Sequence, residues 1–194
     1  AFVMPAEEGP PAPPRAPGGG RLRTQADTAE PARGAAANLT AVRAEYRMIE
    51  NLALSADQLG ALRAAGFTVA QVSPRRGILR GTSAVVGLGD GPANANTITS
   101  DASQIVALDP QAVGYPGSLM GAIAVVRQAF LDAKWYRDAN AAYAKKPSGT
   151  PRPETNLSWA ALQGVIAGTQ PVQFVADEML EVLRSAAILR EAGL

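Results

Sequence analysis

The chain has 194 residues, of which 47% are apolar and 18% are charged, a balance typical of a globular domain with a hydrophobic core. Its 18 basic and 17 acidic residues leave a net charge of +1, which argues against a nucleic-acid binder or a polybasic membrane-surface protein. The sequence contains neither cysteine nor histidine. This excludes disulfides, thiolate nucleophiles, imidazole bases and every Cys- or His-ligated metal site formed within this chain alone.

The sequence says less about the cellular compartment of the protein than about its chemistry. The longest apolar run, residues 119–126, has eight residues and is far shorter than the ~20 that a membrane-spanning helix needs. The sequence starts at Ala1 without an initiator methionine, as a processed product does. With the missing cysteine this favours an extracytoplasmic protein, although a cytosolic protein without cysteine is equally ordinary.

The beginning of the chain differs in composition from the rest. Seven of the 15 prolines lie in the first 31 residues, and Gly18, Gly19 and Gly20 follow a proline-rich stretch. Proline lacks a backbone donor and glycine lacks conformational restraint, so neither propagates a helix or a strand ladder here. We expect residues 1–37 to form an exposed loop or linker and residues 38–194 to form the folded domain.

A capping box begins the first predicted helix. Ser55 and Gln58 have the required spacing, and Gly66 is expected to end the helix in the left-handed conformation. The run of β-branched and aromatic residues over 67–73 then predicts a buried strand.

A basic loop over residues 75–81 and a β-rich insertion over residues 82–110 follow. Within the insertion, residues 87–91 have a Gly-x-Gly-x-Gly pattern. Pro92 stands where a dinucleotide fingerprint needs its third glycine, so the pattern favours a turn over a phosphate-binding loop.

A long helix is predicted to start after Ser118 as N-cap and to run to about Ala144. The apolar residues that form its stripe are spaced by three and four, at Leu119, Ile123, Val126, Phe130 and Ala133.

The remaining elements are a shorter helix over residues 157–167, a strand over 171–175, and a last helix capped by Asp177. We expect the last helix to turn Met179, Leu183 and Ala187 toward the core. Helices that alternate with strands favour a parallel α/β architecture.

The densest basic cluster is formed by Arg75, Arg76 and Arg80. In a parallel sheet this loop would lie at the carboxyl edge, where such folds bind ligands, and guanidinium groups bind a carboxylate or phosphate with two hydrogen bonds. The alternative is that these side chains are solvated or pair with surface acids. The start of the helix after Ser118 is a second candidate for binding an anion, beside its capping role.

Several segments resemble the metal-dependent amidohydrolases, close to the imidazolonepropionase-like branch. Residues 62–72 resemble an early helix-to-strand segment of that family, and residues 74–84 its PxxGIxRGxxA stretch. Residues 115–128 resemble its YPxSLMGxIAxxRQ segment, and residues 171–176 its PVxxxA strand. The resemblance covers residues 46–194.

This resemblance implies a (β/α)8 barrel with a small β-sandwich, and hydrolysis of C–N bonds in cyclic amides, ureas or dipeptides. It also implies a divalent metal such as zinc, which activates a water molecule. Val175 stands where the family has a metal-binding histidine, and a valine side chain donates no lone pair. No cofactor or metal is therefore expected to be bound by this chain alone.

The length of the chain indicates an incomplete barrel. A complete barrel takes about 250 residues, more than residues 38–194 provide. We therefore expect a partial barrel, completed by the same precursor or by another chain, with a homo-oligomer also possible.

The resemblance implies a fragment of a hydrolase that acts on a small molecule with a non-peptide or cyclic C–N bond. The alternative is a non-catalytic structural or oligomerisation module. The candidate ligand-binding residues are Arg75, Arg76, Arg80, Tyr115 and Ser118.

Overall fold

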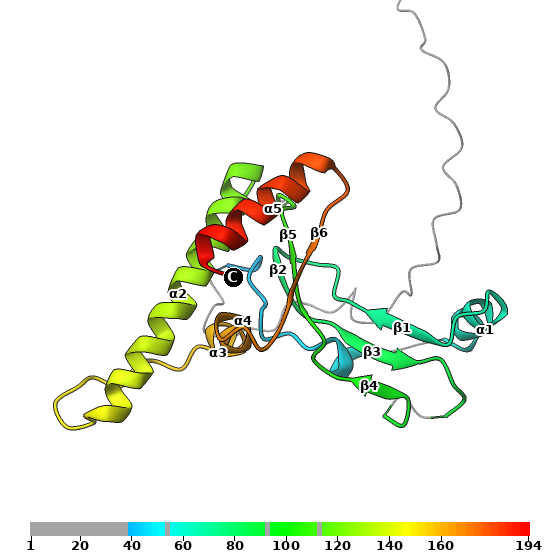
Figure 1. Cartoon of the computed structure of the whole chain (residues 1–194), viewed down its shortest axis with the longest axis horizontal. Coiled ribbons are helices and arrows are strands. Elements are labelled where there is room, and N and C mark those ends of the chain that lie inside the picture. Colours follow the sequence, from blue (N-terminus) through cyan, green and yellow to red (C-terminus); the bar gives the residue numbers. More distant parts are fainter. Residues whose placement is uncertain (1–38, 53–54, 92–93, 112–113) are drawn as a thin grey trace, which may run out of the picture.

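The computed structural model describes residues 39–52, 55–91, 94–111 and 114–194. The linker expected over residues 1–37 lies outside the described residues. Two small three-stranded sheets lie next to each other, and the α-helices other than α1 gather on the sheet that holds β5 and β6 (Figure 1). The result is a mixed α/β fold.

The first sheet is antiparallel throughout and carries the first predicted strand. Its order is β1 (Val69–Val72), β3 (Ala84–Gly87), β4 (Thr97–Thr99). The segment expected to form a buried strand is instead largely exposed: Phe67, just before β1, and Val69, at its start, are 57% and 46% accessible. The prediction of a buried strand was wrong because β1 lies at the edge of a small outer sheet.

The second sheet holds the core. It has the order β2 (Leu79–Thr82), β5 (Gln104–Ala107), β6 (Val172–Val175). Strands β2 and β5 are antiparallel, whereas β5 and β6 are parallel. Single parallel bridges from Val42 to Leu79 and from Arg47 to Thr82 extend the sheet beyond β2.

Two expectations are therefore corrected. The basic loop over residues 75–81 ends early, because its second half forms β2. The insertion over residues 82–110 is divided between the sheets, with β3 and β4 in one and β5 in the other. The expected parallel sheet of a (β/α)8 barrel is not seen in the described residues: of the pairings between the named strands, β5–β6 is parallel and the others are antiparallel. Short connections without a crossover helix join strands in this region, and they suit antiparallel pairing.

The helices agree better with the sequence. α1 (Ala56–Ala64) has the expected capping box, with Gln58 N–H donating to Ser55 Oγ at 3.3 Å, and Gly66 has φ +88°. α2 (Leu119–Lys145) buries the central part of its predicted stripe, Val126, Phe130 and Ala133. The helix expected over residues 157–167 is divided at Leu162 into α3 (Leu157–Ala161) and α4 (Gln163–Ile166).

The last helix, α5 (Met179–Ala192), differs from its prediction in its orientation. Its N-cap is Glu178, without a side-chain cap, while the Asp177 backbone N–H donates to the Glu181 carboxylate at 2.9 Å. The fully buried positions are Ser185 and Ile188, and Met179 and Leu183 are 73% and 55% exposed. No helix in the described part of the chain is long and apolar enough to span a membrane.

The main core lies between the β2–β5–β6 sheet and α2, α4 and α5. Its largest fully buried side chains include Phe130, Ile78, Leu79, Leu162 and Ile188. A smaller cluster of Met48, Val72 and Val86 joins the outer sheet to the 3-10 helix η2 (Met48–Asn51).

Candidate functional site

The carboxyl ends of the parallel strands β5 and β6 gather several of the predicted residues. Ala107 pairs with Val175 at the end of the two strands, and the Ala107 N–H donates to the Ile78 carbonyl. Because β2 is antiparallel to β5, the loop that precedes β2 lies at this carboxyl edge. The loop over residues 75–78, called the arginine loop below, thus lies at the carboxyl edge because it precedes an antiparallel strand, and not because it follows a parallel one.

Arg80 is held inside this edge. It lies on β2 and is only 8% exposed, and its Nη2 is 2.5 Å from Asp109 Oδ2, just after β5. Its Nε also donates to the Gly77 carbonyl at 3.1 Å. The partner and the burial show a structural role, in which Arg80 ties the arginine loop to the end of β5.

Arg75 and Arg76 lie on the exposed part of the same loop, between Pro74 and Gly77. Gly77 has φ +92°, which permits the sharp turn from the loop into the buried residues Ile78 and Leu79. Both residues thus lie at the surface of the carboxyl edge, on a loop that Arg80 ties to Asp109.

Tyr115 and Ser118 lie at the start of α2. Ser118 is the N-cap, and its Oγ accepts from the Gly121 N–H at 3.2 Å, as predicted. Tyr115 precedes a cis-proline and is 58% exposed. It lines a groove of about 460 Å³ along the side of α2, together with Gln128, Asp132 and Trp159. Tyr115 therefore contributes to a surface that the arginine loop does not line.

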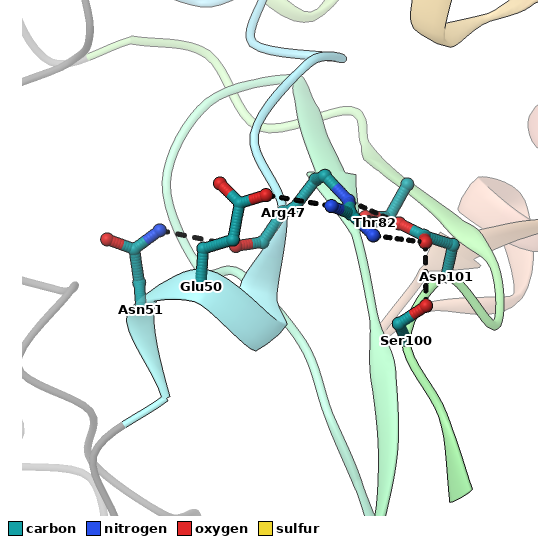
Figure 2. Close-up of polar contacts among 6 residues, drawn as sticks. All are labelled: Arg47, Glu50, Asn51, Thr82, Ser100 and Asp101. Atoms are coloured by element: carbon teal, nitrogen blue, oxygen red, sulfur yellow. Dashed lines mark hydrogen bonds and ion pairs between the residues drawn. The ribbon is translucent and has the colours of Figure 1, made fainter. Parts of the chain in front are cut away.

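A polar network that sequence reasoning missed lies beyond β2, around Arg47 (Figure 2). Arg47 Nε and Nη2 donate to the two carboxylate oxygens of Asp101 at 2.9 and 2.6 Å, and Nη1 donates to Glu50 at 2.8 Å. Ser100 and Thr82 also donate to Asp101, at 2.9 and 3.0 Å. Arg47, Glu50, Thr82 and Asp101 line an open groove of about 590 Å³, together with Glu45 and residues of α3.

The network changes the acidity of its members. Hydrogen bonding to Arg47 lowers the pKa of Asp101 from 3.8 to about 2, with smaller contributions from Ser100 and Thr82. Hydrogen bonds to Asp101 and Glu50 raise the pKa of Arg47 further above its usual value. Arg47 and Asp101 are 54 residues apart, and no local sequence pattern links them. Both groups are charged at neutral pH and satisfy each other, so this groove holds a fixed ion pair.

A second missed cluster joins the two sheets. Gln71 of β1 donates through Nε2 to Ser83 Oγ at 2.9 Å, to Ser103 Oγ at 3.1 Å and to Gln173 Oε1 of β6 at 2.9 Å. The Ser83 and Ser103 hydroxyls are 2.7 Å apart, and both residues are buried. The cluster is neutral, and it fixes the outer sheet against the amino ends of β5 and β6.

The side chains described at the carboxyl edge do not form a set of ligands for a catalytic metal. In the described residues, no group of three carboxylate, imidazole or thiolate side chains is placed to hold an ion. At the carboxyl edge, Asp109 is already paired with Arg80, and Val175 offers no ligand atom.

Comparison with known proteins supports the fold. The chain is similar to the solved structure of an amidohydrolase from Thermotoga maritima MSB8, with a TM-score of 0.65 and 18% identity. The match covers 79% of this chain and 42% of that one, so the chain spans less than half the length of that protein. No family model and no curated protein matches the sequence. The likeness supports an amidohydrolase-like fold, and the imidazolonepropionase-like branch is not confirmed.

Proposed function

We propose that this chain is part of an amidohydrolase-like hydrolase, of the imidazolonepropionase-like kind, that acts on a small molecule with a non-peptide or cyclic C–N bond. In this proposal the chain forms part of a (β/α)8 barrel, and the remaining strands come from the same precursor or from another chain. The observation that carries the proposal is the fold likeness to an amidohydrolase, which agrees with the motifs of the sequence.

The role of this chain is to bind substrate rather than to supply metal ligands. Arg75 and Arg76 stand exposed at the carboxyl edge of β5 and β6, on a loop anchored by the Arg80–Asp109 pair. A guanidinium group there binds a carboxylate or a polarised carbonyl of the substrate through charge-assisted hydrogen bonds. Any imidazole or thiolate ligand of a metal in the complete protein would have to come from residues outside this chain, because its sequence has no histidine or cysteine.

The complete protein, comprising this chain and the remaining barrel, provides the test. We expect it to contain stoichiometric zinc by elemental analysis, to hydrolyse members of a panel of cyclic amides and ureas, and to lose turnover with a chelator. Arg76→Ala is expected to raise KM by about tenfold or more, as for loss of a charged hydrogen bond. Arg152→Ala is the matched control, since Arg152 is exposed in the loop after α2, and it is expected to leave KM unchanged.

A second candidate, a non-catalytic structural or oligomerisation module of the same fold, is favoured by a specific observation. Val175 occupies the place where the resemblance implies a metal-binding histidine, and the described carboxylates at this edge include one already paired with Arg80. If the complete protein retains no zinc and hydrolyses no member of the panel, this second function replaces the first.

A further inference from the structure

Both tryptophans of the chain and two of its four tyrosines line one groove beside α2 or contact its wall. Tyr115 and Trp159 line the groove, which measures about 460 Å³. The ring of Trp159 lies edge-to-face with that of Trp135, with centroids 6.3 Å apart, and its centroid is 6.1 Å from that of Tyr136. Tyr115 and Trp135 are 58% and 59% exposed, so the core does not cover them. We call the groove with these four residues the aromatic groove.

The aromatic groove also offers a carboxylate. Asp132 of α2 is half-buried and is the only charged residue among those that line the groove in the described chain. Its Oδ1 accepts from Gln128 Nε2 at 2.7 Å, whereas its Oδ2 accepts no hydrogen bond from the described residues. Asp132 precedes Trp135 and Tyr136 by three and four positions, so the three residues share one face of α2. An aromatic surface and an accepting carboxylate oxygen therefore lie side by side.

One segment of this chain has the chemistry that such a groove binds. Residues 10–15, which lie outside the described residues, have the sequence Pro-Pro-Ala-Pro-Pro-Arg. Proline-rich segments favour the polyproline II conformation, in which residues three apart share an edge. Two of the edges would each carry a pair of prolines, and the third would carry Ala12 and Arg15. Segments with a P-x-x-P pattern bind in aromatic-lined grooves, because their preformed conformation loses little entropy on binding.

We propose that residues 10–15 bind in the aromatic groove of the same chain. The prolines pack on the exposed rings of Tyr115 and Trp159, which removes apolar surface from water. The Arg15 guanidinium group donates to Asp132 in a charge-assisted hydrogen bond. The proposal does not depend on the proposed function, because the arginine loop does not line this groove.

The lengths of the segment and of the groove agree. In the polyproline II conformation residues 10–15 extend over about 19 Å, at about 3.1 Å per residue. The residues of α2 that line or flank the groove run from Ala124 to Tyr136. They rise over about 18 Å, at about 1.5 Å per residue. The prolines and Arg15 can therefore contact the aromatic rings and Asp132 at the same time.

The connection along the chain favours this segment over the same segment of a second copy. Leu39, the first described residue, itself lines the groove. Residues 16–38 reach up to about 75 Å when extended, so they do not limit access to any part of the groove. A tether that spans its site holds the segment at an effective concentration of about millimolar, far above that of a second copy in dilute solution. Residues 9–26 also contain three arginines and no acidic residue, which complements the negative charge of Asp132.

A spin label on the segment tests whether it reaches the groove. The chain has no cysteine, so Ala16→Cys places a single nitroxide label next to Arg15. The indole N–H signals of Trp135 and Trp159 report its approach in the isotope-labelled 194-residue chain. We expect both signals to be lost by paramagnetic broadening and to return when ascorbate reduces the label. A label at Ile98→Cys, on the exposed side of β4, is the matched control and should leave both signals intact.

Charge variants of the spin-labelled chain test the proposed ion pair. Arg15→Glu should restore both indole signals, because it faces Asp132 with a like charge. Arg23→Glu makes the same change in net charge and is expected to leave the signals broadened. Asp132→Arg should also restore the signals, and its combination with Arg15→Glu should broaden them again. This rescue separates a specific pair from damage to α2.

A third variant tests the proline edges. Pro10→Ala combined with Pro13→Ala keeps all charges and removes the prolines of one edge. We expect it to restore the indole signals, since the segment then loses the preformed conformation and the rings that pack on the groove. Persistent broadening in this variant would show that charge alone holds the segment, which contradicts the proposed fit to the aromatic rings.

Three further results would overturn the proposal. Indole signals that the label at Ala16→Cys does not affect would show that the segment does not occupy the groove. Broadening that persists in Arg15→Glu would remove the pairing with Asp132. Equal broadening in a mixture of spin-labelled chains and separate isotope-labelled chains would show that the segment comes from a second copy.

Discussion

Arg47 binds Asp101 with two parallel hydrogen bonds across 54 residues of sequence, and so fastens the segment before η2 to the turn between β4 and β5. The bridge from Arg47 to Thr82 places the same residue beside β2. Arg47 therefore links three separate parts of the chain, since its guanidinium group binds Asp101 and its backbone bridges to Thr82 (Figure 2).

This pair predicts a loss of stability in acid. The pKa of Asp101 is lowered from 3.8 to about 2 in the folded protein, so the unfolded chain takes up the proton more readily. The contribution is complete above about pH 4 and is lost as the pH falls toward 2. The Asp101 side chain is 37% exposed, so after allowance for solvent screening we expect a contribution of about 1 kcal/mol.

Urea unfolding at several pH values measures this contribution. Asp101→Asn is expected to be less stable at pH 7 and to flatten the pH dependence between 4 and 2. Glu154→Gln, in the exposed loop before α3, is the control and should keep the slope of the original protein. An equal slope in Asp101→Asn and the original protein would contradict the assignment.

Gly81 is expected to tolerate no side chain. It has φ +106°, and a Cβ there would overlap the Tyr46 backbone carbonyl. Gly81→Ala should therefore lower the free energy of unfolding by about 3 kcal/mol or more. Gly60→Ala, in α1 with open space around it, should instead stabilise by about 0.5–1 kcal/mol. Chemical denaturation of the two variants distinguishes the outcomes, and a mild effect at Gly81 would count against this close approach.

Arg80 and Arg76 are expected to differ in their effect on stability. Arg80 is buried and paired with Asp109, so Arg80→Ala should destabilise by about 2–4 kcal/mol. Arg76 is exposed, and Arg76→Ala should change stability by no more than about 0.5 kcal/mol. Thermal unfolding measures both. Equal melting temperatures for the two variants would remove the anchoring role of Arg80.

Ser118 is expected to stabilise α2 through its cap. Ser118→Ala removes the acceptor for the Gly121 N–H and should cost about 1 kcal/mol, whereas Ser118→Asp keeps an acceptor and should cost little. The helical circular-dichroism signal during thermal unfolding reports the difference. Matching losses in both variants would show that the hydroxyl matters for another reason.

Gln71 and Gln173 are expected to be coupled, since their side-chain amides meet at 2.9 Å between the sheets. A double-mutant cycle with Gln71→Ala and Gln173→Ala should give an interaction energy of about 0.5–1.5 kcal/mol. Additive effects in urea unfolding would mean that the cluster does not fasten the outer sheet to β6.

Local patterns predicted the helices well. The Ser55–Gln58 capping box and the Ser118 N-cap are both present, because such signals depend on hydrogen bonds between residues three apart. The orientation of α5 could not be predicted in this way. Its apolar residues surround the helix, so periodicity alone does not say which of them meets the core.

The candidate site was likewise predictable from the sequence only in part. The arginine cluster is visible in the sequence, but its division into a buried anchor, Arg80, and the exposed Arg76 depends on β2 running antiparallel beside β5. The networks around Arg47 and Gln71 join residues many positions apart, and nothing in their local sequence indicates a partner.

Composition alone settles one chemical point: without histidine or cysteine, this polypeptide offers no imidazole or thiolate ligand, wherever its side chains lie. The starts of α1 and α2 are likewise determined by short stretches of residues, which form their caps. Strand direction, the partner of each charge and the covered side of α5 depend on contacts between distant segments, because a strand is completed by hydrogen bonds to a neighbour that its own residues do not specify.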